Sequence, residues 1–416
     1  MRIQRQVTSA NAFALLLAAS IVFAPAVAPA ANLPLAKLAG TWEFALVGNT
    51  SCGQTSLWFS GDLNGDGQAN GELWSSSACG VDTVSYQAFA IANWDSRNGK
   101  ATATLSCGSG CTWHFDIQTT PNEQVMNLAD VYDSTAYLTG TGVKMIVAGG
   151  EKASRSVHAR ISPNKAKAAP AITLAQLAGT WQIALSGQTG CGLNSLLFSG
   201  TLNAKGLAYG TLFSSSGCGT GAESNQTLTI TGLDADGSGS AILTCGAGCG
   251  WSLIFQLSIN KQIMNFVDIE DSNNYLAGSA TKLDPNGTLT LGTFLGDWQI
   301  TFSGNTDCGA NALEFSGSLG TNGQGDGELR SSSGCGVNID GTQDFTVTSF
   351  NADGSGTANL SCGNGCAWNF RIQVSPNGKV FALADVSDPN NYLAGIAIQY
   401  PFSTERDDTT PPVSQE

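Results

Sequence analysis

Two cysteines separated by three residues and followed by a tryptophan occur three times, as CGSGCTW at 107–113, CGAGCGW at 245–251 and CGNGCAW at 362–368. Two single cysteines precede each pair. Four thiols that lie close together allow three chemistries: a tetrahedral zinc site, a redox centre or a set of disulfides. A thioredoxin-like redox centre requires a Cys-x2-Cys sequence that leads into a helix, and neither the spacing nor the helix is found here. The choice is therefore between zinc and disulfides.

The start of the chain favours disulfides. Arg2 and Arg5 precede an apolar stretch at 12–28, and Ala28-Pro29-Ala30 has the small-x-small pattern of a cleavage site. Residues 1–30 are therefore predicted to be a secretory signal peptide. We expect a secreted or periplasmic protein, with association to the cell surface as an option. Thiols outside the cytoplasm oxidise in pairs.

The cysteine count is even in every repeat, as a disulfide framework requires. Three pairings per repeat are open from the sequence. We prefer Cys52 with Cys79 and Cys107 with Cys111, because the intervening glycines allow a five-residue loop to close. No metal and no cofactor is expected. The cysteines predicted to form disulfides are Cys52, Cys79, Cys107, Cys111, Cys191, Cys218, Cys245, Cys249, Cys308, Cys335, Cys362 and Cys366.

The cysteines belong to a module that is repeated three times. The modules begin with LAGTWEFAL at 38–46, LAGTWQIAL at 177–185 and FLGDWQITF at 294–302. Their predicted bounds are 33–145, 172–282 and 288–400. Between the first two lies a basic segment, 146–171, which is interpreted as a linker, and the polar end at 401–416 is predicted to be disordered.

Within each module the hydrophobic period is two, which indicates strands. Trp42, Phe44 and Leu46 are expected to be buried, and Thr41, Glu43 and Ala45 to face water. Turn residues divide the first module into eight predicted strands, at about 41–48, 55–63, 70–77, 84–94, 100–106, 112–119, 124–130 and 136–144. No helix is predicted. The fold class is all-β, as three tandem antiparallel up-and-down barrels, with β-sandwich modules as the alternative.

The Gly-x-Trp that opens each module, at 40–42, 179–181 and 296–298, resembles the calycin barrels, the family of lipocalins and avidins. The resemblance covers strand number, strand order and this tripeptide. It implies that the tryptophan closes one end of each barrel and that the other end opens onto a ligand.

The first, third and fifth connections of an up-and-down barrel lie at the same end, so the four cysteines of a module are expected to gather at one rim. Polar and aromatic residues predicted near this rim form a candidate site for a small polar or sugar-like ligand. The alternative, which we favour, is that the aspartates cap backbone N–H groups in tight turns. The candidate ligand-binding residues are Ser75, Ser77, Trp113, Asp130, Trp251, Asp268, Trp368 and Asp385.

The acidic net charge of the chain disfavours some classes of binding partner. The chain has 18 basic and 32 acidic residues, a net charge of −14, and removal of Arg2 and Arg5 brings it to about −16. That balance argues against nucleic acid and anionic lipid surfaces. No apolar run in the mature chain is long enough to cross a bilayer as a helix, so membrane insertion is not expected.

Catalysis finds little support, because the chain has only His114 and His158. His114 aligns with Ser252 and Asn369 in the other modules, so no histidine belongs to every repeat. We therefore expect a non-enzymatic binding protein that engages an unidentified cell surface, polymer or small molecule at the barrel rims. Two alternatives remain: a structural component of a surface layer, matrix or appendage that self-assembles, and a ligand carrier or inhibitor of the calycin type.

Overall fold

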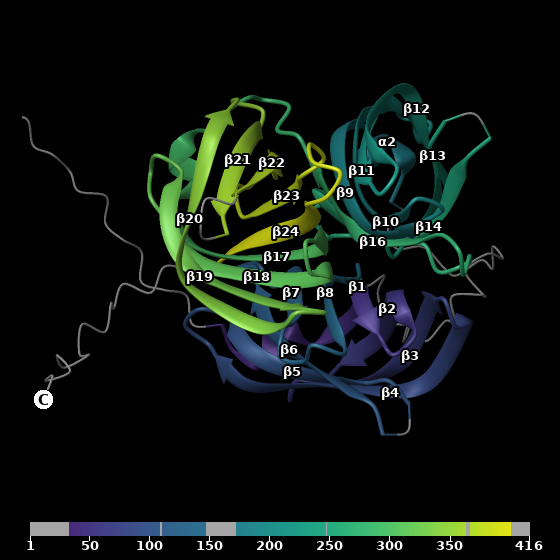
Figure 1. The fold of residues 1–416 in the computed structure, drawn as a ribbon, viewed down its shortest axis with the longest axis vertical. Coiled ribbons are helices and arrows are strands. Elements are labelled where there is room, and N and C mark those ends of the chain that lie inside the picture. Colours follow the sequence, from purple (N-terminus) through teal and green to yellow (C-terminus); the bar gives the residue numbers. More distant parts are fainter. Residues whose placement is uncertain (1–32, 109, 147–171, 247, 363–366, 401–416) are drawn as a thin grey trace, which may run out of the picture.

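The computed structural model describes residues 33–108, 110–146, 172–246, 248–362 and 367–400. The predicted signal peptide, all but the first residue of the predicted linker and the predicted disordered tail lie outside these residues. Twenty-four strands form three closed barrels of eight, each barrel antiparallel throughout (Figure 1). The predicted all-β fold of three tandem up-and-down barrels is confirmed, and the sandwich alternative is wrong.

The strands of the first barrel fall close to the predicted ones. They are β1 (Gly40–Thr50), β2 (Gly53–Leu63), β3 (Gln68–Ser77), β4 (Gly80–Asp95), β5 (Lys100–Ser106), β6 (Thr112–Thr119), β7 (Val125–Asp130) and β8 (Tyr137–Lys144). Each strand pairs with the next along the chain, and β8 pairs with β1 to close the ring. Closure leaves no unpaired strand edge.

The other two barrels repeat this order. The second contains β9 (Gly179–Thr189), β10 (Gly192–Leu202), β11 (Leu207–Ser216), β12 (Gly219–Leu233), β13 (Ser238–Thr244), β14 (Gly250–Leu257), β15 (Ile263–Val267) and β16 (Tyr275–Lys282). The third contains β17 (Gly296–Thr306), β18 (Gly309–Leu319), β19 (Gln324–Ser333), β20 (Gly336–Phe350), β21 (Ser355–Ser361), β22 (Ala367–Val374), β23 (Val380–Ala384) and β24 (Tyr392–Tyr400).

A helix of one turn precedes each barrel, which the sequence prediction missed. These helices are η1 (Leu35–Leu38), α2 (Leu174–Leu177) and η2 (Leu291–Phe294). Four residues are too few to show a helical period, so pattern reasoning cannot find them. Each helix is tied to the barrel by the tryptophan of Gly-x-Trp: Trp42 Nε1 donates to the Leu38 carbonyl at 2.7 Å. The tryptophan thus closes the barrel end where the first strand begins, as the calycin resemblance implied.

The interior of the first barrel is filled by side chains. Phe44 packs against Phe59 and Phe89, with ring centroids 5.6 and 4.8 Å apart, and Trp42 stacks on Phe44. These aromatic side chains are fully buried, together with leucines and isoleucines from the other strands. The inward phase predicted from the period of two is therefore right.

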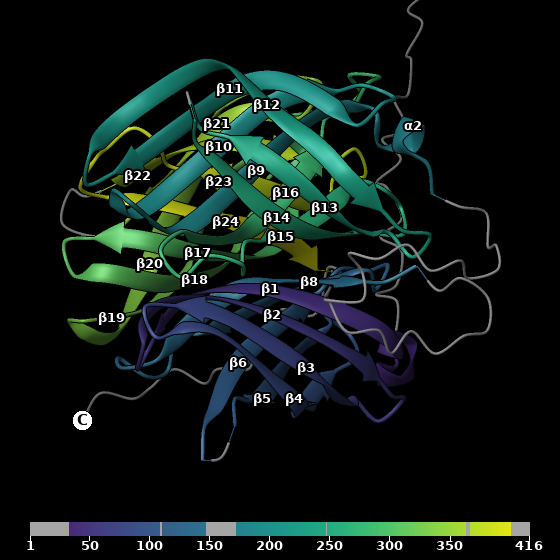
Figure 2. The same ribbon diagram turned by 90° about the vertical axis from the view of Figure 1, so that its right-hand side faces the viewer.

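The outward phase of β1 was predicted wrongly. Thr41, Glu43 and Ala45 were expected to face water, but all three are buried, and Glu43 is fully so. The reason is that the barrels pack against one another in a ring, in which each touches both of the others (Figures 1 and 2). Their first and last strands surround a common axis, where Gly140, Gly278 and Gly395 come together.

Each contact in the ring joins the first three strands of one barrel to the last three strands of the next. The middle residue of each Ser-Ser-Ser sequence ties the contact. Ser76 donates to the Asp271 carbonyl at 2.7 Å, and Ser332 donates to the Asp133 carbonyl at 2.5 Å. Ser215 donates in the same way to the Asp388 carbonyl. The order is therefore cyclic: first onto second, second onto third, and third onto first.

Candidate functional site

The disulfides lie in the first, third and fifth connections of each barrel, at the end opposite the tryptophan. The preferred pairing is present: Cys52–Cys79, Cys191–Cys218 and Cys308–Cys335 have Cα atoms 5.4–5.5 Å apart, and Cys107–Cys111 and Cys245–Cys249 have them 5.1 Å apart. Cys362 is also disulfide-bonded, and Cys366, its predicted partner, lies outside the described residues. These five disulfides fit an extracellular or otherwise oxidising environment, and zinc has no thiolate ligands in the first two barrels.

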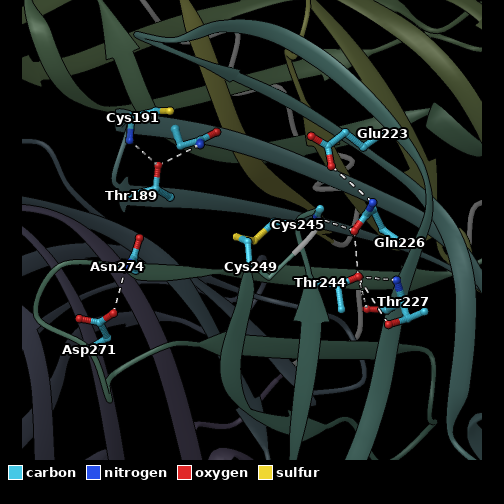
Figure 3. The surroundings of a disulfide bond; sticks show 12 residues. Thr189, Cys191, Glu223, Gln226, Thr227, Thr244, Cys245, Cys249, Asp271 and Asn274 are labelled. Atoms are coloured by element: carbon cyan, nitrogen blue, oxygen red, sulfur yellow. Dashed lines mark hydrogen bonds between the residues drawn. A yellow bond between two sulfur atoms is a disulfide. The ribbon is translucent and has the colours of Figure 1, made fainter.

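A glutamine that sequence reasoning overlooked holds the short disulfide loop in the first and second barrels. In the second barrel, Gln226 Oε1 accepts hydrogen bonds from the Gly246 amide at 2.8 Å and from Thr244 Oγ1 at 2.9 Å (Figure 3). In the first barrel Gln87 accepts from the Gly108 amide at 2.7 Å. The same glutamine is present in all three modules, and this recurrence could have identified it from the sequence.

The aspartates predicted at the rims are buried and bonded to backbone. Asp130 Oδ2 accepts from the His114 amide at 3.1 Å, and Asp385 Oδ2 accepts from the Asn369 amide at 2.8 Å. Asp268 Oδ1 accepts from the Glu270 amide at 3.2 Å. The bonds from His114 and Asn369 reach across from strand six of the barrel, whereas the bond from Glu270 caps the turn that follows Asp268. Asp130 and Asp385 also cap their turns, accepting from the Tyr132 amide at 3.4 Å and from the Ser387 amide at 3.0 Å, as the sequence favoured. Burial raises the pKa of Asp130 to about 6 and that of Asp268 to about 7, and it raises the pKa of Asp385 as well.

The other predicted rim residues are divided between core and turn. Trp113, Trp251 and Trp368 are each at most 7% exposed and pack into the cores of their barrels. Ser77 is buried, and its hydroxyl accepts from the Cys79 amide at 3.2 Å, while Ser75 is half-buried. Trp113 and Asp130 come close because β6 is adjacent to β7 in the barrel. The serines on β3 lie across the barrel from them.

The three contacts of the ring differ in one set of equivalent positions. Strands two and three place two residues directly opposite each other: Trp58 with Trp74, Leu197 with Phe213, and Glu314 with Arg330. Each pair faces the middle of strand six of the next barrel. There the residue is Ile254, Arg371 or Asp116, respectively.

The three contacts thus have the same backbone arrangement but different types of side chain at these equivalent positions. Between the first and second barrels, Trp58 and Trp74 pack in an apolar cluster with Val267 and Ile269. Between the second and third, the Arg371 guanidinium lies 4.1 Å from the centre of the Phe213 ring. Between the third and first, Arg330 pairs with Asp116 at 3.3 Å. Among the described residues, this last contact is the one that contains an ion pair between two barrels, and we call it the ionic contact.

A cavity of about 500 Å³ opens in the ionic contact. One wall comes from β4, β5 and β6 of the first barrel, and the other from β17, β18 and β19 of the third. We call it the cleft, and its charged and amide side chains are Asn93, Asp95, Lys100, Asp116, Gln299, Glu314, Glu328 and Arg330. Its volume falls within the range of small-molecule sites.

Glu314 is the most deeply placed acid of the cleft, at 5% exposure. Its Oε1 accepts from Gln299 Nε2 at 2.6 Å and from Ser316 Oγ at 3.2 Å, while its Oε2 is buried without a hydrogen-bond partner. Burial, with the nearby Asp116 carboxylate, raises the pKa of Glu314 to about 7. A buried carboxylate with one oxygen unused is costly on its own, so it is poised for a donor or a cation.

Among the described residues, no helix has the length and apolar character needed to cross a bilayer.

Comparison with known proteins identifies no family. No family model matches the chain, and no curated protein matches it. Among solved structures, those titled "Crystal structure of CghA" and "Crystal structure of CghA with Sch210972" align with it at 7% and 8% identity. They cover 88% and 87% of this chain and 90% and 89% of their own, each with a TM-score of 0.22. Likeness at that level supports no statement about this protein's function.

Proposed function

We propose that this is a secreted, non-enzymatic binding protein that holds a small polar ligand in the cleft between its first and third barrels. The observation that carries the proposal is internal to the chain. One contact geometry occurs three times, and in two of them large side chains fill it. In the third, Glu314 and Arg330 replace Trp58 with Trp74 and Leu197 with Phe213, and a cavity remains.

Stability alone does not favour this replacement. Well-packed apolar side chains are often at least as stabilising as a buried ionic cluster of the same volume. The first two contacts show that this position accepts apolar residues. A charged, hollow version at one place is what a ligand site requires, with a few polar groups in an enclosed space.

The absence of catalysis is part of the proposal. Its support is the residue inventory of the cleft, which contains no histidine and no cysteine. The serine of the cleft, Ser316, donates to the Glu314 carboxylate at 3.2 Å without a histidine between them, so the usual Ser-His-Asp arrangement is not formed. That statement covers the described residues. The acids of the cleft accept hydrogen bonds or ion pairs from neighbouring side chains instead.

The test replaces three residues of the ionic contact by the residues at the equivalent positions of the contact between the second and third barrels; we call the product the transplant variant. The triple variant Asp116→Arg, Glu314→Leu, Arg330→Phe gives the ionic contact the residues of Arg371, Leu197 and Phe213. We expect it to fold with at least the stability of the parent and to lose binding in a screen of polar small molecules monitored by ligand-observed NMR. A screen in which parent and variant give the same hits would overturn the proposal.

A structural role is the second candidate, and exposed apolar side chains at the rims of the first and third barrels favour it. Val81 is 51% exposed, and Val337 and Ile339 are 45% and 60% exposed, all at the starts of long strands beside the disulfides. Such side chains offer self-association contacts. Concentration-dependent filaments or lattices, seen by electron microscopy and abolished by Val337→Asp with Ile339→Asp, would favour this role.

A further inference from the structure

The acids of the cleft differ in whether a cation already neutralises them. Asp95 is paired with Arg97 at 3.3 Å, and Asp116 is paired with Arg330 at 3.3 Å. The Arg330 guanidinium also bonds Glu328. Among the described residues, no lysine or arginine nitrogen lies within ion-pair distance of Glu314. Glu314 is therefore the one carboxylate of the cleft whose charge has no direct partner.

Both cations of the cleft already interact with neighbouring side chains. Arg330 is shared between two acids, and the Lys100 ammonium lies 4.5 Å from the centre of the Tyr400 ring. An anionic ligand would enter a space lined by four carboxylates and only these two cations, so repulsion would oppose it. A neutral ligand would leave Glu314 either protonated or, once ionised, without a counter-charge. A cation removes that deficit, because a buried carboxylate is stabilised by an opposite charge with hydrogen bonds.

The position of Lys100 adds a geometric argument. Lys100 lines the cleft, and its ammonium group rests on the ring of Tyr400 from β24, the arrangement by which proteins hold organic cations. The second and third barrels have Ser238 and Ser355 at the position of Lys100, so a lysine stands at this position only in the first barrel.

We infer that the ligand of the cleft is an organic cation bearing a primary amine or similar ammonium group, and that the Glu314 carboxylate binds this group through Oε2. The inference rests on the proposed function and names its ligand class. The ammonium donates to Oε2, while Gln299 and Ser316 hold Oε1 and so fix the carboxylate.

The experiment compares two probes of equal length, putrescine and 1,4-butanediol, by isothermal titration calorimetry on the full chain. We expect putrescine to bind with a Kd on the order of 1 mM or tighter and the diol to bind at least about tenfold more weakly. Glu314→Gln keeps the shape and removes the charge, so it should weaken putrescine at least about tenfold. Glu72→Gln, the equivalent of Glu328 in the first barrel, should bind as the parent does.

The possible failures are distinguishable. If the diol and other neutral probes bind the parent as well as putrescine does, and the transplant variant loses them, the cation inference is wrong and the proposed function stands. If putrescine binding survives Glu314→Gln, Glu314 is not the counter-ion and the inference is overturned. If no amine binds, the inference fails, and the polar-molecule screen decides the proposed function separately.

Discussion

The Arg330 guanidinium of the third barrel lies 3.3 Å from the Asp116 carboxylate of the first, at positions where the second and third barrels bring Phe213 and Arg371 together. The same site in the repeat thus carries an ion pair once and a cation on an aromatic ring once. The Arg330 and Asp116 side chains are only partly buried, so water weakens the attraction between them more than it would for an ion pair in a protein core.

We expect the Asp116 and Arg330 side chains to show a coupling of about 1 kcal/mol in the free energy of unfolding. The measurement is a double-mutant cycle with Asp116→Asn and Arg330→Met, followed by urea denaturation. Salt should reduce the coupling, because ions screen exposed charges. The exposed pair Asp95 and Arg97 is the control, with an expected coupling near zero. Equal couplings for the two pairs would contradict this account of the ionic contact.

The free energy of unfolding is expected to fall as the pH rises from about 5 to about 8. Burial raises the folded-state pKa of Asp130, Asp268 and Glu314 to between about 6 and 7. A raised pKa contributes stability below the unfolded value, near 4, and this contribution is lost as the pH passes the folded value. Carboxylates with lowered pKa, such as Asp271, act in the opposite direction only at lower pH.

Thermal unfolding followed by circular dichroism at several pH values tests this dependence. Asp268→Asn keeps an oxygen that accepts from the Glu270 amide and removes the titration, so its unfolding temperature should vary less with pH. A parent protein whose unfolding temperature rises steadily towards pH 8, or a variant with an unchanged slope, would refute the assignment.

The two disulfides of a barrel are expected to differ in their contribution to stability. Cys52 and Cys79 are separated by 27 positions in the sequence, and Cys107 and Cys111 by 4, so the first disulfide closes the longer loop. In the chain-entropy treatment the first is worth about 3.5 kcal/mol and the second about 2 kcal/mol. Paired Cys→Ala replacements, compared by urea midpoint, should therefore rank in that order. The reverse ranking would show that strain or residual unfolded structure outweighs loop entropy.

Glycine is required where the barrels meet at the axis. A Cβ at Gly278 would overlap the Ala184 carbonyl oxygen on the paired strand β9, so Gly278→Ala should destabilise the protein by about 3 kcal/mol. Gly190 lies in a turn with open space around its Cα, and Gly190→Ala should change the stability by less than about 0.5 kcal/mol. Urea midpoints of the two variants provide the comparison. Equal effects would mean that the axis can relax to accept a methyl group.

Much of each barrel was predictable from the sequence. The period of two in segments such as the one from Trp42 to Leu46 gave the strands and their inward phase, because the pleat alternates side chains over a few residues. The turn residues gave the strand order, the even cysteine count predicted disulfides, and the glycines between Cys107 and Cys111 favoured the pairing that is present. The one-turn helices escaped because they are shorter than any period that would reveal them.

The candidate site was not predictable in the same way. The rim aspartates recur in the repeats, and that recurrence reflects turns that every barrel needs. Glu314, Arg330 and Asp116 do not recur, and a comparison of repeats that searches for shared residues passes over them. Ser76 was also overlooked beside Ser75 and Ser77, although its hydroxyl is the one that reaches the next barrel.

The sequence by itself determined three disulfide-stapled, up-and-down barrels, because strand alternation, turns and repeat length are local properties of the chain. Only the tertiary structure decided that the barrels close into a ring, that the outer face of β1 is buried and that one contact is hollow and charged. Those features depend on which surfaces meet across about 200 residues of chain, as Arg330 meets Asp116 with a separation of 214. Such long-range contacts leave no periodic trace in the sequence.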